Sequence, residues 1–188
     1  MTFEAPPRIE TRRLLLRLVL PSDLPDLLQV NGDAEVTRFL PYATWKGLAD
    51  GEAWFKRMAK ISATGDALQF VSVEKDSGRA IGTCLLFRYD SASARAEIGY
   101  VMGRASWRRG FTQEALSALI THAFDGCGLR RLEAEVDPAN VASNRLLLKL
   151  GFTAEGMQRE RWVSKGVTAD SSLYGLLSRE WPGATAER

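Results

Sequence analysis

The sequence predicts a mixed α/β protein built on a mostly antiparallel sheet. Segments with the two-residue period of strands alternate with segments that repeat about every 3.6 residues, in the order β-α-α-β-β-β-α-β-α-β-β. Three strands follow one another without an intervening helix, and strands joined by short turns pair antiparallel. The expected fold therefore has seven strands and four helices.

The composition is that of an ordinary globular domain. Hydrophobic residues make up 45% and charged residues 26% of 188 residues, which fits one domain over 1–188 with an ordered core over about 9–181. A net charge of +2 does not favour nucleic-acid binding. No apolar run approaches the roughly 20 residues of a membrane span, and residues 1–10 lack the apolar core of a signal peptide. We expect a cytoplasmic protein with no membrane or nucleic-acid partner.

Cysteine and histidine are too few for a disulfide framework or a metal site. Cys84 and Cys127 do not form a CxxC pair. His122 is the single histidine, so a His/Cys metal site and a Ser-His-Asp triad are both disfavoured. We expect no metal.

The first half of the chain begins with a strand and two helices. A strand is expected over 11–19, and a helix follows in 21–30, where Ser22 or Asp23 can cap its start. The apolar spacing of 47–62 predicts the second helix.

Three consecutive strands come next, over 67–75, 80–90 and 95–103. Alternation places the residues of the third strand on two faces. Ala96, Ile98, Tyr100 and Met102 share one face, and Glu97, Gly99 and Val101 share the other.

The second half returns to alternating elements. A helical stripe predicts a helix over about 112–125, and a strand follows over 130–138. Another helix is expected within 139–152, and two strands near 155–165 and 171–179 complete the sheet.

The stretch WRRGFTQEAL at 107–116 is a turn that leads into a helix. A helix start carries free backbone N–H groups and a positive dipole end, which together can bind a phosphate. Gly110 permits close approach of a ligand, and Arg108 and Arg109 add positive charge. Neither a GxxxxGK[ST] nor a GxGxxG pattern occurs. Taken alone, these residues are consistent with a pyrophosphate-binding loop and equally with a solvated turn.

Polar residues follow the strand at 130–138. Asn140 lies in the turn after that strand, and Ser143 lies one helical turn further on. Such side chains can simply cap a helix. They can also line a slot where two strands diverge.

Six stretches together resemble the GNAT superfamily of acetyltransferases, and specifically its RimJ/RimL-like branch. They occur in that branch's order and spacing, from near residue 9 to residue 181. The stretches are IETRRLLLR at 9–17, AEVTRFLP at 34–41, RAEIGYVM at 95–102, WRRGFTQEAL at 107–116, DPANVASNRLLLKLGF at 137–152 and LYGLLSREW at 173–181.

The resemblance implies a GNAT fold that binds acetyl-CoA as co-substrate. This fold has a twisted, mostly antiparallel seven-stranded sheet with helices on both faces, and its fourth and fifth strands splay around the cofactor. A bulge in the strand IGYVMG would open that gap, and pantetheine would pair with its backbone. The implied cofactor-binding residues are Val101, Met102, Arg108, Arg109, Gly110, Phe111, Thr112, Gln113, Asn140, Ser143 and Asn144.

Three positions depart from the superfamily pattern. Arg108 stands where many relatives have glycine, so the loop conformation is open to question. Thr112 replaces a small residue. Leu147 occupies the place of the tyrosine that protonates the departing thiolate in many members. The resemblance therefore assigns catalysis near the thioester sulfur to Ser143.

Glu97 is our candidate for the base that accepts a proton from the amine. It lies on the strand that leads to the thioester, although it can equally be an ion-pair partner of Arg95. Glu135 and Glu160 are rival candidates. An α-amine makes a modest demand on a base, because its pKa is about 7.7–8.0 against about 10.4 for lysine.

The resemblance implies transfer of an acetyl group to a primary amine, most simply the α-amine of a protein or peptide N-terminus, as in ribosomal-protein-alanine acetyltransferases. The alternatives are a small-molecule amine, a CoA-binding sensor without turnover, and a nucleic-acid binder. A homodimer is possible by analogy alone. The expected acceptor-binding residues are Phe39, Leu40, Trp45, Arg161 and Trp162.

Overall fold

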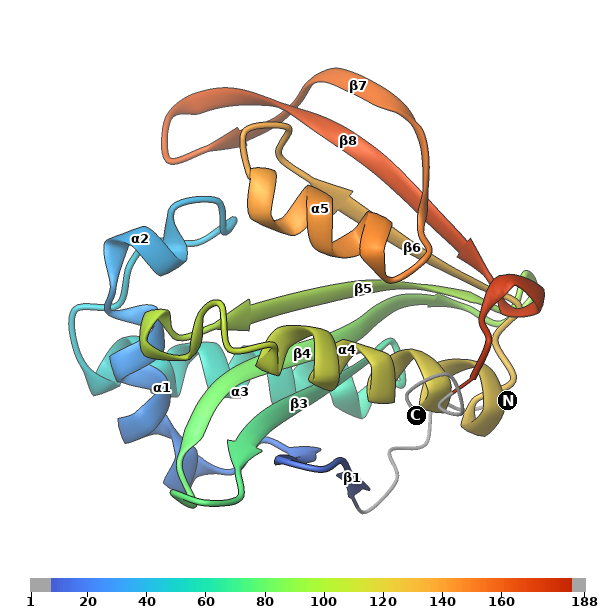
Figure 1. The fold of residues 1–188 in the computed structure, drawn as a ribbon. Helices are drawn as coiled ribbons and strands as arrows, with labels where there is room; N and C mark the ends of the chain where they lie inside the picture. Colours follow the sequence, from blue (N-terminus) through green and yellow to red (C-terminus); the bar gives the residue numbers. More distant parts are fainter. Residues whose placement is uncertain (1–7, 184–188) are drawn as a thin grey trace.

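The computed structural model describes residues 8–183, whose strands form one eight-stranded sheet in the order β1-β2-β3-β4-β5-β6-β8-β7 (Figure 1). Residues 1–7 and 184–188, the ends of the expected domain, lie outside the described part. The strands are β1 (Ile9–Glu10), β2 (Leu14–Leu18), β3 (Ala67–Glu74), β4 (Ala80–Asp90), β5 (Arg95–Met102), β6 (Arg131–Val136), β7 (Thr153–Ser164) and β8 (Val167–Leu177). The helices are α1 (Leu24–Asn31), α2 (Ala34–Thr37), α3 (Leu48–Ala63), α4 (Phe111–Thr121) and α5 (Val141–Lys149).

The mixed α/β class and the mostly antiparallel sheet are confirmed, but the expected number of strands was one too low. The expected strand at 11–19 is the shorter β2, and the additional strand is β1, which precedes it across a turn in which Leu14 N–H donates to Thr11 Oγ1 (2.9 Å). A two-residue strand is too short to produce a visible alternation. The short helix α2, capped by Asp33, was missed for the same reason.

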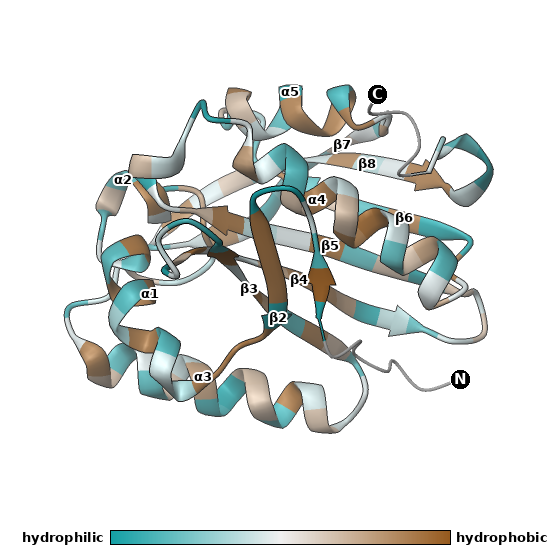
Figure 2. Cartoon of the chain, turned by 60° about the horizontal axis from the view of Figure 1, so that its bottom comes forward, coloured by the Kyte–Doolittle hydropathy of each residue, from teal (hydrophilic) through white to brown (hydrophobic). Residues whose placement is uncertain are grey.

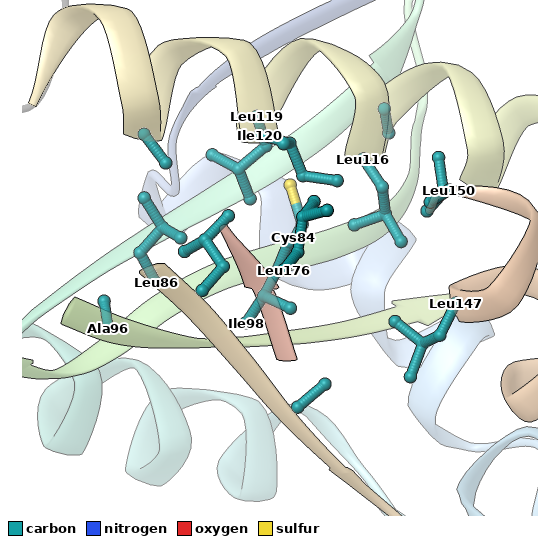
Figure 3. Packing of buried hydrophobic residues seen from close by; sticks show 14 of the residues in the cluster. Cys84, Leu86, Ala96, Ile98, Leu116, Leu119, Ile120, Leu147, Leu150 and Leu176 are labelled. Atoms are coloured by element: carbon teal, nitrogen blue, oxygen red, sulfur yellow. The ribbon is translucent and has the colours of Figure 1, made fainter. Parts of the chain in front are cut away.

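Helices cover both faces of the sheet, as expected. The main core lies on one face, where α4 and α5 pack against apolar side chains of β2 to β6 and β8. Figure 3 shows Leu116, Leu119 and Leu147 from these helices against Ile98 of β5. Full burial of each such side chain contributes about 1.5–3 kcal/mol. On the other face, α1 and α3 pack against β3, with Val71 and Trp54 in their shared core.

The hydropathy of the helices follows this two-sided arrangement. In Figure 2, α3 and α4 carry alternating hydrophilic and hydrophobic residues, as expected of helices with one side on the sheet and one in solvent.

The sheet opens between β5 and β6. These strands are parallel, and only Arg95 to Glu97 of β5 pair with Arg131 to Glu133 of β6. Beyond that point β5 continues to Met102 along β4, whereas β6 continues to Val136 along β8. The expected splay of the fourth and fifth long strands is therefore present. It leaves a wedge-shaped gap between two strand edges.

The bulge expected in the strand IGYVMG is not there. The β4–β5 register runs without a shift from Gly82↔Met102 to Phe87↔Glu97. The irregularity follows Phe87 on β4, where one extra residue enters the strand before Asp90 and Arg88 has φ +52°. Where the two strands part, β5 stays paired with β4 and β6 stays paired with β8, so the splay occurs without a break in β5.

Candidate functional site

The backbone of β5 presents free groups to the gap. Gly103 N–H donates to Ile81 C=O on β4 (2.8 Å), and bonded pairs alternate along an antiparallel ladder. The backbone groups of Tyr100 and Met102 therefore face the gap, while those of Val101 face β4. Of the two residues expected to pair with pantetheine, Met102 is on the gap edge and Val101 is not. Val101 instead packs its side chain with Val30 and Val36.

Trp107 covers one of these edge groups. Its indole Nε1–H donates to the Met102 carbonyl at 2.6 Å. The Met102 N–H and both backbone groups of Tyr100 remain on the gap edge.

The turn before α4 keeps a left-handed conformation at two residues. Gly110, the residue before the helix, has φ +78°, and Arg108 has φ +59°. Glycine adopts such angles freely, whereas an ordinary residue there costs about 1–2 kcal/mol. The glycine that many relatives have at position 108 is thus replaced without a change in the sign of φ.

Free backbone donors line this turn. Among the described residues, no protein acceptor takes the N–H groups of residues 108–113, because the first bond of the helix is Glu114 N–H to Gly110 C=O. Consecutive free N–H groups at a helix start form an anion site. This arrangement favours the pyrophosphate reading of WRRGFTQEAL.

Glu114 fastens the start of α4 to the other end of the chain. It accepts hydrogen bonds from the Thr11 hydroxyl (2.6 Å) and from Arg13 N–H and Nε–H (both 2.7 Å). Arg13 also donates to the Arg109 carbonyl (2.8 Å). These bonds hold the turn in place, and sequence reasoning missed them because the partners are about 100 residues apart.

The side chains of the turn differ in whether they are already engaged by other protein groups. Arg109 pairs with Glu74 (3.2 Å) and lies over the Phe111 ring, so its guanidinium is already engaged. Arg108 is exposed and makes no ion pair within residues 8–183. Phe111 is buried, and Thr112 and Gln113 are half-buried. A ligand at this turn meets backbone N–H groups first and Arg108 second.

The start of α5 faces β5 across the gap. Asn140 caps the helix through the Ser143 N–H (3.2 Å), as the simpler reading predicted. The Ser143 hydroxyl lies 2.6 Å from the hydroxyl of Tyr100. Asn144 accepts from Tyr174 (2.6 Å) and donates to two backbone carbonyls, so its amide is occupied within the protein.

Tyr100 was missed as a site residue. The alternation of β5 correctly places Tyr100 on the same face as Ile98 and Met102, and the structure shows that this face packs against the main core. The sequence carries no signal that its hydroxyl meets Ser143, because the partner comes from a helix 43 residues away. Burial raises the pKa of Tyr100 to about 12, although the Ser143 bond acts in the opposite direction.

Glu97 lies at the apex of the gap on the opposite face of the sheet. It is 9% exposed and accepts from Arg88 Nη1 at 2.6 Å. Burial raises the pKa of its carboxyl, and the positive charge of Arg88 works against this rise. The expected alternative partner, Arg95, pairs with Asp90 and Glu133 instead.

The β4 bulge explains how Arg88 reaches Glu97. Phe87 is opposite Glu97 in the ladder, so an unbulged Arg88 would point to the other face. The extra residue places Arg88 on the face of Glu97. Arg88 also contacts Glu135 (3.3 Å), a rival candidate base. The third candidate, Glu160, is exposed on a bulged part of β7, where its N–H donates to Asp170.

The expected acceptor-binding residues separate into two groups. Trp45 is a core residue and not a pocket residue: it is 6% exposed and packs against Trp54 at 5.6 Å between ring centroids. Trp162 and Arg161 are exposed and gather around Glu135, to which Trp162 donates from Nε1 (3.0 Å). Phe39 and Leu40 are half-buried after α2.

The β7–β8 hairpin links these groups. Lys165, at its turn, donates to the Thr37 carbonyl at the end of α2 (2.6 Å), so the hairpin tip lies over α2 (Figure 1). Phe39 and Leu40 thus lie close in sequence to the contact point. Trp162 lies on the hairpin that reaches it.

The described residues also bear on metals and membranes. Within 8–183, no three His, Cys, Asp or Glu side chains are grouped to hold a metal ion. No helix in that range is long and apolar enough to cross a membrane.

A family model described as an acetyltransferase (GNAT) domain matches residues 13–153. The chain belongs to the GNAT acetyltransferase family. As a GNAT protein it is an acyltransferase, and the gap between β5 and β6 is the feature around which its candidate site is built.

Three similar proteins illustrate the relationship. This GNAT chain is 35% identical to "Uncharacterized N-acetyltransferase p20" of Bacillus licheniformis over 92% of its own length and 97% of the relative's. It is 29% identical to "[Ribosomal protein uS5]-alanine N-acetyltransferase" of Escherichia coli (strain K12) over 94% of both chains. The crystal structure of a GCN5-related N-acetyltransferase from Brucella melitensis is similar with a TM-score of 0.83 and 29% identity, covering 93% of this chain and 80% of the other.

Proposed function

We propose that this protein transfers an acetyl group from acetyl-CoA to the α-amine of a protein or peptide N-terminus. The observation that carries the proposal is the division of the site by β5. The free N–H groups of 108–113 and the Ser143 hydroxyl belong to the elements on one face, and the Glu97 carboxylate lies on the other. An acyl donor in the gap can therefore be attacked from the face opposite its own binding elements.

The residues of the gap fit acetyl-CoA. The N–H groups of 108–113 would take the pyrophosphate, with Arg108 as an additional charge. The edge groups of Tyr100 and Met102 would pair with the amides of the pantetheine arm. Acetyl-CoA supplies the activated acyl group.

Glu97 suits the role of base. A buried carboxylate with a raised pKa accepts a proton more readily than a solvated one. An α-amine with a pKa of about 7.7–8.0 is partly neutral near pH 7. Its reaction therefore depends on correct orientation toward the thioester as much as on removal of a proton. Ser143 faces the sulfur side in this arrangement and stabilises the departing thiolate.

The charges near Glu97 favour an N-terminal amine over a polyamine. Glu133 and Glu135 share its face, but each of the three carboxylates is paired with an arginine: Arg88 contacts Glu97 and Glu135, and Arg95 and Arg131 contact Glu133. A polycationic acceptor would need unpaired carboxylates. The name of the Escherichia coli relative, an alanine N-acetyltransferase of ribosomal protein uS5, supports a protein acceptor.

Thiol release from acetyl-CoA tests the proposal across peptides with free N-termini, N-blocked peptides carrying lysine, and small amines. We expect turnover with free N-termini and little with their N-blocked counterparts. Faster turnover of a polyamine, an amino sugar or an amino acid would contradict an N-terminal acceptor and identify a small-molecule amine in its place. Tight CoA binding without thiol release for any amine would contradict catalysis and favour a sensor.

A further inference from the structure

Ser143 is not accompanied on its helix by the tyrosine that protonates the departing thiolate in many members of the superfamily. Many members carry a tyrosine four residues after the serine position, but here Leu147 is fully buried in the core. The serine hydroxyl nevertheless has a phenol at 2.6 Å, because Tyr100 reaches it from β5 across the gap. This phenol belongs to β5, whereas the superfamily's tyrosine would belong to the same helix as the serine.

The Tyr100–Ser143 bond has a preferred direction. A phenol oxygen shares its lone pairs with the ring, so it is a better donor and a poorer acceptor than an aliphatic hydroxyl. On this ground we assign Tyr100 as the donor to Ser143 Oγ, since the 2.6 Å separation itself fits either direction. A serine hydroxyl carries one proton and two lone pairs, so its proton remains available for another acceptor. Within the described residues, Ser143 Oγ has no other protein partner.

The neighbouring bonds hold Ser143 in place. Its own N–H is tied to Asn140, and the next residue, Asn144, is tied to Tyr174 of β8. The first turn of α5 is thus fastened through Tyr100 to β5, which borders the gap, and through Tyr174 to β8, the next strand beyond β6. Of these two phenols, only Tyr100 bonds the side chain of Ser143.

We propose that Tyr100 is a positioning residue for the departing thiolate: its phenol fixes the Ser143 hydroxyl so that the serine proton points into the gap, toward the thioester sulfur. The inference rests on the proposed function. The amine nitrogen forms the new N–C bond, the C–S bond breaks, and its electron pair leaves on sulfur. The proton lost by the amine passes to Glu97. Ser143 donates a hydrogen bond to the thiolate, which takes a proton from solvent after release.

The protonation state of Tyr100 suits this role. Its pKa of about 12, raised by burial, keeps the phenol protonated throughout the pH range in which the enzyme would work. The donor to Ser143 is therefore constant, and only the sulfur changes its charge.

Binding of CoA and desulfo-CoA, measured by titration calorimetry between pH 7 and pH 9, tests the inference without an acceptor. The thiol ionises near its ordinary pKa of about 8.5, and a hydrogen bond to a charged atom is stronger than one to a neutral atom. The wild type should prefer CoA increasingly as the pH rises, to about tenfold at pH 9. Tyr100→Phe and Ser143→Ala should both remove that rise.

Tyr174→Phe is the matched control, because it deletes a phenol hydroxyl that fastens the same helix turn but does not touch Ser143. It should keep the rise in CoA preference. A rise in Tyr100→Phe equal to that of the wild type, or an equal loss in Tyr174→Phe, would overturn the inference. Since Ser143→Ala breaks the same bond from the helix side, it checks the result if Tyr100→Phe folds poorly.

Turnover gives a second readout. Tyr100→Phe should lower kcat about tenfold with little change in the KM for acetyl-CoA, and adding it to Ser143→Ala should cause no further loss. Multiplying losses would mean that Tyr100 does not act through Ser143. Absence of all CoA binding by the wild type would contradict the proposed function itself, whereas CoA binding without a thiolate preference contradicts this inference alone.

Discussion

At the scale of the residue, Arg88 shows how one inserted position changes the chemistry of a site. The bulge turns its side chain to the face of Glu97, where it lies between two carboxylates and 5.7 Å from the Trp162 ring. A nearby positive charge stabilises the carboxylate form, whereas burial destabilises it. Arg88 therefore limits how far burial raises the pKa of Glu97.

Replacing Arg88 tests this role. Arg88→Met should raise the pKa of Glu97 further, because burial would then act without the opposing charge. A base works only when deprotonated, so the acid limb of kcat/KM should move to higher pH. The pH profile of thiol release measures the shift. Arg95→Met, which removes an arginine of the same face that does not contact Glu97, should leave the limb in place; equal shifts in both variants would exclude a specific Arg88 effect.

At the scale of the element, the turn at 107–110 combines a strained residue with a permissive one. Arg108 has φ +59°, an angle that glycine adopts without strain. The hydrogen bond between Arg13 and Glu114 holds the turn in this conformation. The strain is offset by the surrounding contacts, and the N–H groups of 108–113 stay directed to one ligand.

Glycine substitutions distinguish the contributions of Arg108 and Arg109 to the stability of the fold. Arg108→Gly relieves about 1–2 kcal/mol of backbone strain and costs about 0.5–1 kcal/mol in chain entropy, so the free energy of unfolding should be unchanged or slightly higher. Arg109→Gly relieves no strain and loses the Glu74 pair, so it should lower that free energy by about 1 kcal/mol. Urea unfolding of both variants gives the comparison. Equal destabilisation would show that Arg108 is unstrained.

Helices and strands could be predicted from the sequence where their apolar periodicity extends over many residues. The apolar stripe of α4 and the alternation of β5 were sufficient to predict both elements and the faces of Glu97 and Tyr100. The β4 bulge was not predictable, because an extra residue at Arg88 leaves no composition signal. The burial of Trp45 was also not predictable, because its neighbours Gly51 and Trp54 meet it only in the folded chain.

At the scale of the whole molecule, the site depends on strands that part and on distant segments that meet. Resemblance to the family predicted the splay, and the short β5–β6 ladder shows it. The contacts that complete the site join residues far apart in sequence: Glu114 with Arg13, Tyr100 with Ser143, and Lys165 with Thr37. Periodicity describes neighbours along the chain, so it cannot reveal such pairs.

Amide hydrogen exchange with and without CoA tests the central claim, that the gap and the adjoining turn hold the acyl donor. We predict slower exchange for the N–H groups of residues 108–113 and for those of Tyr100 and Met102 when CoA is bound. The exposed strand β7 should exchange equally in both states and serves as the internal reference. Unchanged exchange in both the turn and the β5 edge, with saturating CoA bound, would contradict this account.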